Sequence, residues 1–191
     1  MHHHTLSLGR LAGVAALACA TALAPAAALA GTASPAAPAA QAGTPRCATS
    51  GLVVWMNTQG DGAAGSIYYT LKFTNLSGHA CTLRGYPGVS AVSLSGRQLG
   101  TPARWGTSPA TTVTLASGAT AYAVLQYSDV VTGGSGPRPC DAVTAAGLRA
   151  YPPDQTASKI VPFPLKACTR SGLVYMGVAP VQKAPPPGQQ P

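Results

Sequence analysis

The sequence contains no glutamate, and aspartate supplies only four acidic side chains in 191 residues. After residue 30 there is a single histidine, His79, and no two cysteines are spaced as C-x-x-C. Paired-carboxylate glycosidases, calcium loops and zinc sites all need more acidic, His or Cys ligands at close spacing. The composition therefore argues against these classes of site, and we expect no metal and no cofactor.

A nucleophilic active site is equally hard to assemble from these residues. Such a site needs a nucleophile, a base and an orienting group, and no G-x-S-x-G elbow is present. His79 is the one neutral-pH base after residue 30, and it lies in a turn, two residues after Ser77. We therefore expect a protein that is not an enzyme. A hydrolase that uses His79 remains our third choice.

One glycine-rich motif has the wrong surroundings for nucleotide binding. Residues 60–65 (GDGAAG) match G-x-G-x-x-G, which cradles phosphates when it opens onto a helix. Here a strand-like sequence follows the motif, so we expect a hairpin loop.

The N-terminus has the features of an export signal. An apolar, Ala-rich stretch ends at Ala28-Leu29-Ala30, a small-x-small cleavage site, which predicts a signal peptide over residues 1–30 and an extracellular, secreted protein. A membrane anchor has less support, because Pro25 interrupts the stretch and no stop-transfer charges follow. Ala16-Leu17-Ala18-Cys19 leaves a lipoprotein open as the alternative, tethered to the cell surface through Cys19.

The rest of the chain divides into one domain between two tails. Residues 31–45 are rich in Ala and Pro, and residues 182–191 (QKAPPPGQQP) are rich in Pro and polar side chains. Neither segment can bury enough apolar surface to fold, so we expect a flexible linker and a disordered tail. Residues 46–181 suffice for one hydrophobic core. We expect a monomer with no transmembrane segment once the signal is removed.

Four cysteines remain after residue 30, and an even number in an exported domain favours two disulfides. If the strands on either side of residue 61 form a hairpin, Cys47 comes close to Cys81. The same argument for a turn near residue 155 brings Cys140 towards Cys168. We therefore predict the pairs Cys47–Cys81 and Cys140–Cys168.

The chain is basic, but its charges are dispersed. Of its twelve Lys and Arg residues only Arg10 precedes residue 31, so eleven positive charges face four Asp, a net charge of +7. There is no basic block and no aromatic RNA-binding motif. We therefore expect no nucleic-acid partner, while outside the cell an anionic wall polymer remains a candidate.

Alternation of apolar and polar residues recurs between Gly, Pro and Ser turns, and helical periodicity is almost absent. In residues 66–75 (SIYYTLKFTN) the alternation places Ile67, Tyr69, Leu71 and Phe73 on one face. In residues 160–165 the two prolines are two apart, so their missing N–H groups fall on one side and predict an edge strand. The predicted strands are residues 52–57, 66–75, 81–83, 89–94, 111–115, 120–127, 147–151, 160–165 and 173–178.

About nine short strands of this kind predict an all-β fold. We expect a two-sheet antiparallel β-sandwich, immunoglobulin-like or jelly-roll-like, with two disulfides, and keep a closed barrel as the alternative.

With catalytic, metal and nucleotide sites disfavoured, we expect a binding function. Trp105, with Arg104 beside it, is the best candidate for an exposed aromatic, and Tyr86 is a further candidate for a binding surface. Trp55 lies in an apolar strand, so we expect it in the core. The leading hypothesis is a secreted or cell-envelope module that binds a wall polymer, a glycan or an extracellular protein. The alternative is a secreted protease inhibitor that presents residues 99–109 to an enzyme.

Residues 69–88 (YTLKFTNLSGHACTLRGYPG) resemble a family of secreted proteins of high-GC Gram-positive bacteria, the actinobacteria, catalogued as domain of unknown function 4232. The resemblance extends over most of residues 47–178 and includes Cys47, residues 113–118 (VTLASG), Cys140 and Cys168. It implies an exported β-sandwich with two disulfides, often behind a signal or lipoprotein peptide. It implies no activity and assigns no functional residue.

Overall fold

The computed structural model describes residues 43–63, 65–128 and 140–188. The expected signal peptide, Cys19 and residues 31–42 of the expected linker lie outside the described residues. Within them the chain forms twelve strands and one short 3-10 turn, Thr49–Gly51, so the fold is all-β as predicted. The strands are β1 (Leu52–Met56), β2 (Asp61–Ala63), β3 (Ser66–Asn75), β4 (Cys81–Arg84), β5 (Gly88–Val92), β6 (Gln98–Leu99), β7 (Arg104–Trp105), β8 (Thr112–Leu115), β9 (Thr120–Ser128), β10 (Ala142–Tyr151), β11 (Lys159–Cys168) and β12 (Met176–Val178).

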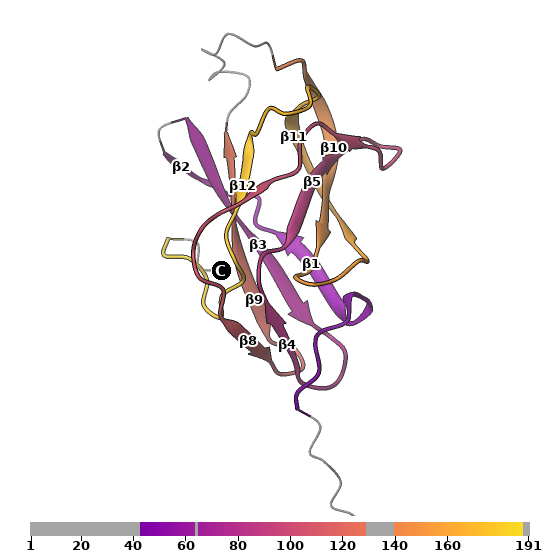
Figure 1. Ribbon diagram of the computed structural model, residues 1–191, viewed down its shortest axis with the longest axis vertical. Helices are drawn as coiled ribbons and strands as arrows, with labels where there is room; N and C mark the ends of the chain where they lie inside the picture. The colour runs from indigo at the N-terminus through magenta and orange to yellow at the C-terminus, as the bar shows by residue number, and fades with distance from the viewer. Residues whose placement is uncertain (1–42, 64, 129–139, 189–191) are drawn as a thin grey trace, which may run out of the picture. The chain divides into compact units, whose positions relative to one another are not determined.

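The strands form two main sheets and a small ladder (Figure 1). The larger sheet has the order β1-β3-β9-β12-β7, with β2 added to β3, and the smaller sheet has the order β11-β10-β5-β6. Strands β4 and β8 pair with each other. All strand pairs are antiparallel except β12 with β7.

The strand order distinguishes between the two expected topologies. An immunoglobulin sandwich places strands A-B-E-D in one sheet and C-F-G in the other. Here β1-β3-β9 reproduce the order A-B-E, and β5-β10-β11 reproduce C-F-G. Strand β12, which comes last in the chain, lies beside β9 where strand D would lie. The topology is therefore immunoglobulin-like with a changed fourth strand.

Side chains of the two sheets meet in one core. The ring of Tyr69 on β3 packs edge-on against Phe163 on β11, with centroids 4.8 Å apart. The hydroxyl of Tyr127 on β9 donates a hydrogen bond to the carbonyl of Lys166 on β11 at 2.8 Å. These contacts join the buried faces of the sheets as in a sandwich.

On the outer face of the larger sheet, one charged side chain is buried although the alternation pattern predicts a polar face. Leu71 and Phe73 are fully buried on the inner face as predicted, but Lys72 on the outer face is also only 3% exposed. It lies opposite Trp55 in β1 and Tyr122 in β9, and its Nζ is 4.2 Å from the centre of the Trp55 ring. Cation–π attraction therefore takes the place of an acidic partner.

The expectation that Trp55 lies in the core is wrong, because its ring is 42% exposed. Alternation turns Leu52, Val54 and Met56 inwards, and Trp55 therefore faces outwards over Lys72.

Strand β11 lies at the edge of the smaller sheet, as its prolines predicted. A Cβ at Gly147 in β10 would collide with the carbonyl oxygen of Val161 and would lie 3.1 Å from the backbone nitrogen of Phe163. That side of β11 faces β10, so the alternate residues Pro162 and Pro164 turn their nitrogens to the free edge. At these two positions the free edge offers no N–H donor, which disfavours pairing with another chain.

The C-terminal segment continues the larger sheet beyond the domain end that we expected. Gln182, expected at the start of a flexible tail, exchanges two backbone hydrogen bonds with Tyr122 on β9. Val181 before it is fully buried.

Both disulfides form as predicted, Cys47 with Cys81 and Cys140 with Cys168. The first links the start of the domain to β4, where the backbone of Cys47 also donates a hydrogen bond to the carbonyl of Thr82. The second links the start of β10 to the end of β11.

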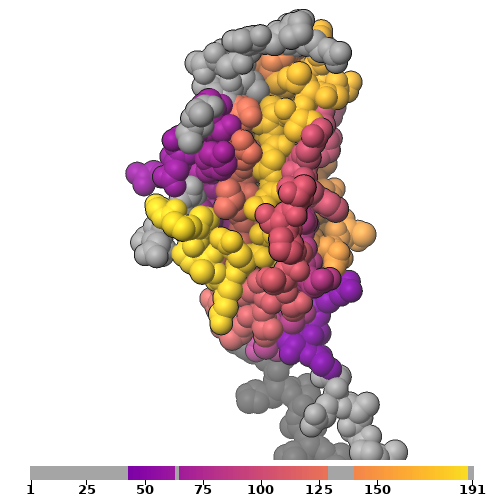
Figure 2. Space-filling model, turned by 60° about the vertical axis from the view of Figure 1, so that its left-hand side comes forward, coloured from indigo at the N-terminus to yellow at the C-terminus, as the bar shows by residue number. Residues whose placement is uncertain are grey.

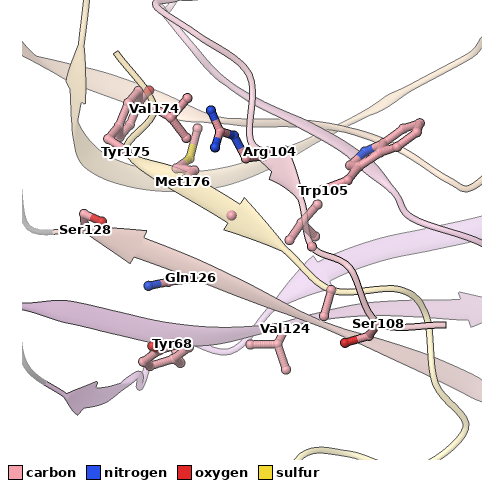
Figure 3. Close-up of a pocket in the computed structure, with 14 residues that line it drawn as sticks. Tyr68, Arg104, Trp105, Ser108, Val124, Gln126, Ser128, Val174, Tyr175 and Met176 are labelled. Carbon is pink, nitrogen blue, oxygen red and sulfur yellow. The ribbon is translucent and has the colours of Figure 1, made fainter. Parts of the chain in front are cut away.

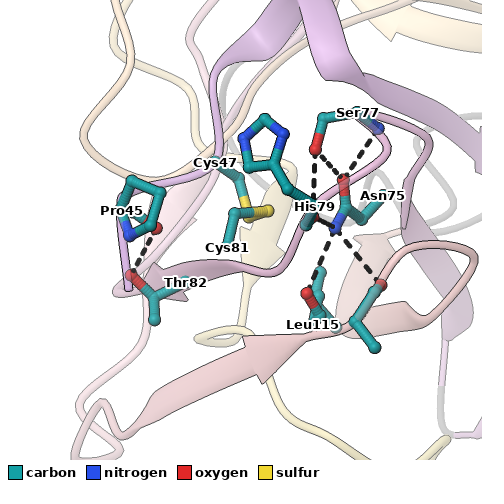
Figure 4. The surroundings of a disulfide bond; sticks show 9 residues. Pro45, Cys47, Asn75, Ser77, His79, Cys81, Thr82 and Leu115 are labelled. Carbon is teal, nitrogen blue, oxygen red and sulfur yellow. Dashed lines mark hydrogen bonds between the residues drawn. A yellow bond between two sulfur atoms is a disulfide. The ribbon is translucent and has the colours of Figure 1, made fainter. Parts of the chain in front are cut away.

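Asn75, at the end of β3, lies at the centre of a buried hydrogen-bond network (Figure 4). Its Nδ2 donates to the carbonyl oxygens of His79, Leu115 and Ala116 at 2.8, 3.1 and 3.2 Å. Its Oδ1 accepts from the backbone and the hydroxyl of Ser77 at 3.0 and 2.7 Å. One side chain thus joins the turn before β4 to the turn between β8 and β9.

We predict that Asn75→Ala lowers the free energy of unfolding by about 2 to 4 kcal/mol, because several buried carbonyls lose their donor. Asn57→Ala is the matched control, since the Asn57 side chain takes no part in this network. Chemical denaturation of both variants measures the difference. Equal losses would contradict the assigned role of Asn75.

For the first disulfide we predict that Cys47→Ser and Cys81→Ser lower the free energy of unfolding by similar amounts. The bridge spans 34 residues, for which loop-closure entropy gives about 3 to 4 kcal/mol. Denaturation of the two single variants and the double variant tests this. A double variant much less stable than either single variant would show that the two residues do not act as one bridge.

Candidate functional site

A groove of about 360 Å³ lies at the outer face of the larger sheet. Strands β3, β9 and β12 and the segment that carries β7 run side by side along this face, which Figure 2 shows as purple, orange-red, yellow and pink bands. The lining includes Tyr68 from β3, Gln126 from β9, Gly177 from β12 and Arg104 from β7.

These four residues form one row across the sheet. Tyr68 lies opposite Gln126, Gln126 opposite Gly177, and Gly177 beside Arg104 in the register of the three strand pairs. Residues in one row share a face, so the three side chains surround the position where Gly177 has none. The groove is therefore hollowed over a glycine.

Gly177 forms the floor of the groove, and its backbone conformation is one that other residues can also adopt. A Cβ at this position would lie 3.4 Å from Gln126 Oε1 and 3.8 Å from the Arg104 carbonyl oxygen. Both are ordinary contact distances, so a side chain could be added here, and it would occupy the groove.

The Gln126 amide is oriented by a hydrogen bond from its Nε2 to Ser66 Oγ at 3.1 Å. Its Oε1 therefore points towards the Gly177 floor as an acceptor. Arg104 is exposed, and its side chain extends on the side of the groove that Val174 lines (Figure 3). Among residues 43–63, 65–128 and 140–188 it forms no ion pair, whereas Arg46 and Arg170 each contact an Asp.

Trp105 and Tyr86, two of the predicted surface residues, lie together. Their rings are stacked with centroids 5.7 Å apart and an angle of 18° between planes, and Trp105 is 60% exposed. Because neighbours along a strand face opposite ways, the Trp105 ring points away from the side chain of Arg104 (Figure 3). Arg104 and Trp105 both line the groove, whereas Tyr86 is not part of its lining.

The structure does not arrange the residues considered for an inhibitor or a hydrolase as those functions require. Residues 99–109, the expected inhibitor loop, are tied into the fold, since Ala103 is buried and donates its N–H to the Val89 carbonyl, and Arg104–Trp105 pair with β12. The Ser77 hydroxyl donates to Asn75 Oδ1 and to the His79 carbonyl, so it is bonded to groups other than the imidazole.

In the part of the chain that the structure describes, no cluster of three His, Cys, Asp or Glu side chains could hold a metal ion. Likewise, none of the described helical segments is long and apolar enough to cross a membrane.

The described residues of the glycine-rich motif belong to a hairpin, as expected. Asp61 to Ala63 form β2, which pairs with β3 in place of the helix that a nucleotide loop requires.

A buried tyrosine lies beneath one end of the groove. Tyr175 is almost fully buried, its hydroxyl donates to the Leu99 carbonyl at 3.3 Å, and its ring packs edge-on against Tyr127. Burial, with a smaller contribution from charge on Tyr127, raises the pKa of Tyr175 from 10.0 to about 12.

The fold and the groove together define an immunoglobulin-like β-sandwich with a mixed polar and apolar surface site. A family model described as a domain of unknown function, DUF4232, matches residues 47–182, and the chain belongs to this family. The resemblance found in residues 69–88 is thereby confirmed. Searches of curated proteins and of solved structures found no match.

Tyr175 gives a testable pH dependence. The folded state raises its pKa, so above pH 10 the unfolded chain loses this proton first, and the free energy of unfolding falls by about 2 to 3 kcal/mol as the pH rises from 10 to 12. Tyr175→Phe should remove this part of the slope while leaving the fold intact at pH 8. Urea denaturation between pH 8 and pH 12 measures it. Parallel curves for the two proteins would contradict the assignment.

Proposed function

We propose that this protein is an exported, non-catalytic binding module of the cell envelope or medium, and that it binds a wall polymer, glycan or extracellular protein in the groove over Gly177. The predicted signal peptide and the two disulfides support export, because disulfides persist in oxidising compartments.

The observation that carries the proposal is the combination of groups in the groove. An exposed cation, Arg104, and an oriented acceptor, Gln126 Oε1, flank a floor that has no side chain. A binding site commonly has this character, with an apolar lining and a few convergent polar groups.

The inhibitor alternative has less support. A loop that blocks a protease has to project into the enzyme cleft, whereas residues 99–109 are bonded to Val89 and to β12.

We predict that Gly177→Leu abolishes binding to envelope material by filling the groove, and that it keeps or raises the melting temperature, because leucine suits a strand better than glycine. Co-sedimentation with purified cell walls of the source organism measures binding, and thermal denaturation checks the fold.

Gly62→Leu is the matched control for this experiment. Gly62 lies in β2, where an added Cβ meets nothing within 4 Å, and it does not line the groove. Equal co-sedimentation of the wild type and both variants would refute the groove as the binding site.

A further inference from the structure

We propose that the ligand of the groove is a carboxylated glycan, whose acid group pairs with Arg104 and whose hydroxyl groups donate to Gln126. This inference rests on the proposed function and names its ligand class.

The charge of the ligand follows from Arg104. Its guanidinium is exposed at the groove and has no acidic partner among the described residues, while Asp154 and Asp141 lie with Arg46 and Arg170. A planar guanidinium binds a carboxylate through two parallel hydrogen bonds. The excess of positive charge over the whole chain would also raise the local concentration of a polyanion.

The hydroxyl groups of the ligand follow from Gln126. Its Nε2 donates to Ser66, and its Oε1 is the atom that would lie 3.4 Å from a Cβ on Gly177, so an acceptor faces the floor of the groove. A carboxylate has no proton to donate to this atom, so the ligand also needs a donor, and the hydroxyl groups of a sugar supply it.

The ring structure of the ligand follows from the apolar part of the lining. Val124, Tyr68 and the exposed Val174 line the groove and supply apolar surface beside the polar groups. The C–H faces of sugar rings fit such a surface, whereas a flexible polyol-phosphate chain has no comparable face. We therefore choose a carboxylated sugar over a phosphate polymer.

The extent of the ligand follows from the strand spacing. Arg104 and Gln126 are separated by β12, so their backbones lie about 10 Å apart, two strand spacings. The exposed Trp105 extends the surface further on the other side of β7. A site of this width suits a chain of sugars better than a single sugar.

The first experiment uses three preparations of the same purified wall: untreated, amidated at its carboxyl groups with carbodiimide and ammonia, and stripped of phosphodiesters with cold hydrofluoric acid. We expect amidation to abolish co-sedimentation of the wild-type protein and phosphodiester removal to leave it unchanged. The opposite pattern would assign the groove to a phosphate polymer and overturn the inference.

The second experiment changes the protein. Arg104→Gln should weaken binding to untreated wall about tenfold to a hundredfold, the usual effect of losing a hydrogen bond to a charged group. Arg97→Gln makes the same change of charge at an exposed residue outside the groove lining and should have little effect. Equal binding by both variants would overturn the role of Arg104.

The third experiment uses a defined probe. The chain has two tryptophans, so Trp55→Phe leaves Trp105 as the single fluorescent reporter beside the groove. We expect oligogalacturonate to change its emission saturably, with affinity at least about tenfold above that of the methyl-esterified oligomer. If neither oligomer binds while wall binding stays sensitive to amidation, the acid belongs to wall peptide and the glycan assignment fails.

These outcomes separate the inference from the proposed function. Wall binding that is lost in Gly177→Leu but is insensitive to amidation and to Arg104→Gln would keep the groove as the site and overturn only the ligand class. Wall binding that survives Gly177→Leu would overturn both.

Discussion

The side chain of Asn75 fixes the geometry on which the larger sheet depends. It holds the turn that leads into β4 and the turn between β8 and β9 against the end of β3, and the first disulfide closes the same region. With these turns fixed, β9 can pair with β3 in only one register, from Thr74 opposite Thr120 to Ser66 opposite Ser128. A shift by one residue would turn every outer side chain of β9 inwards. The part of the row that sets Tyr68 opposite Gln126 therefore depends on a buried amide about seven residues away along β3.

The outer face of this sheet is closed in one part and open in another. Towards the Asn75 end, Lys72 lies under Trp55 and beside Tyr122, and the C-terminal segment pairs with Tyr122 through Gln182. Further along the same strands there is no comparable cover over Gly177 among the described residues, and the groove forms there. Large side chains cover the outer face around Lys72, whereas the lack of a side chain at Gly177 leaves a groove in the same face.

Much of the fold followed from local patterns in the sequence. Alternation predicted β3 with its bounds, two prolines predicted the edge position of β11, and hairpin geometry predicted both disulfide pairs. Each of these follows from the pattern within one strand or from two strands joined by a short connection. Trp105, named from the sequence as a candidate exposed aromatic, is indeed exposed.

The groove could not be predicted because it depends on which strands are neighbours. Alternation alone puts Tyr68 and Gln126 on the outer faces of their strands, but nothing local places β12 between β9 and β7 or sets Gly177 beside Arg104. Trp55 was misplaced for a related reason, since the apolar run of β1 concealed its alternation. Cross-strand rows are long-range features, and they are set by sheet order and register.

Among the described arginines, the side chains of Arg104, Arg84 and Arg97 have no acidic or carbonyl partner, and of these three Arg104 lines the groove. Arg46 and Arg170 lie 3.6 and 3.8 Å from aspartates, and Arg149 donates to the carbonyl of Gly96. Arg104 has none of these partners among the described residues, although it is fixed in a strand beside a groove. An exposed guanidinium stays hydrated at little energetic cost, and an acid group that enters the groove can replace that water with two directed hydrogen bonds. Pairing Arg104 within the fold would have stabilised the domain only slightly and would have removed the charge from the groove.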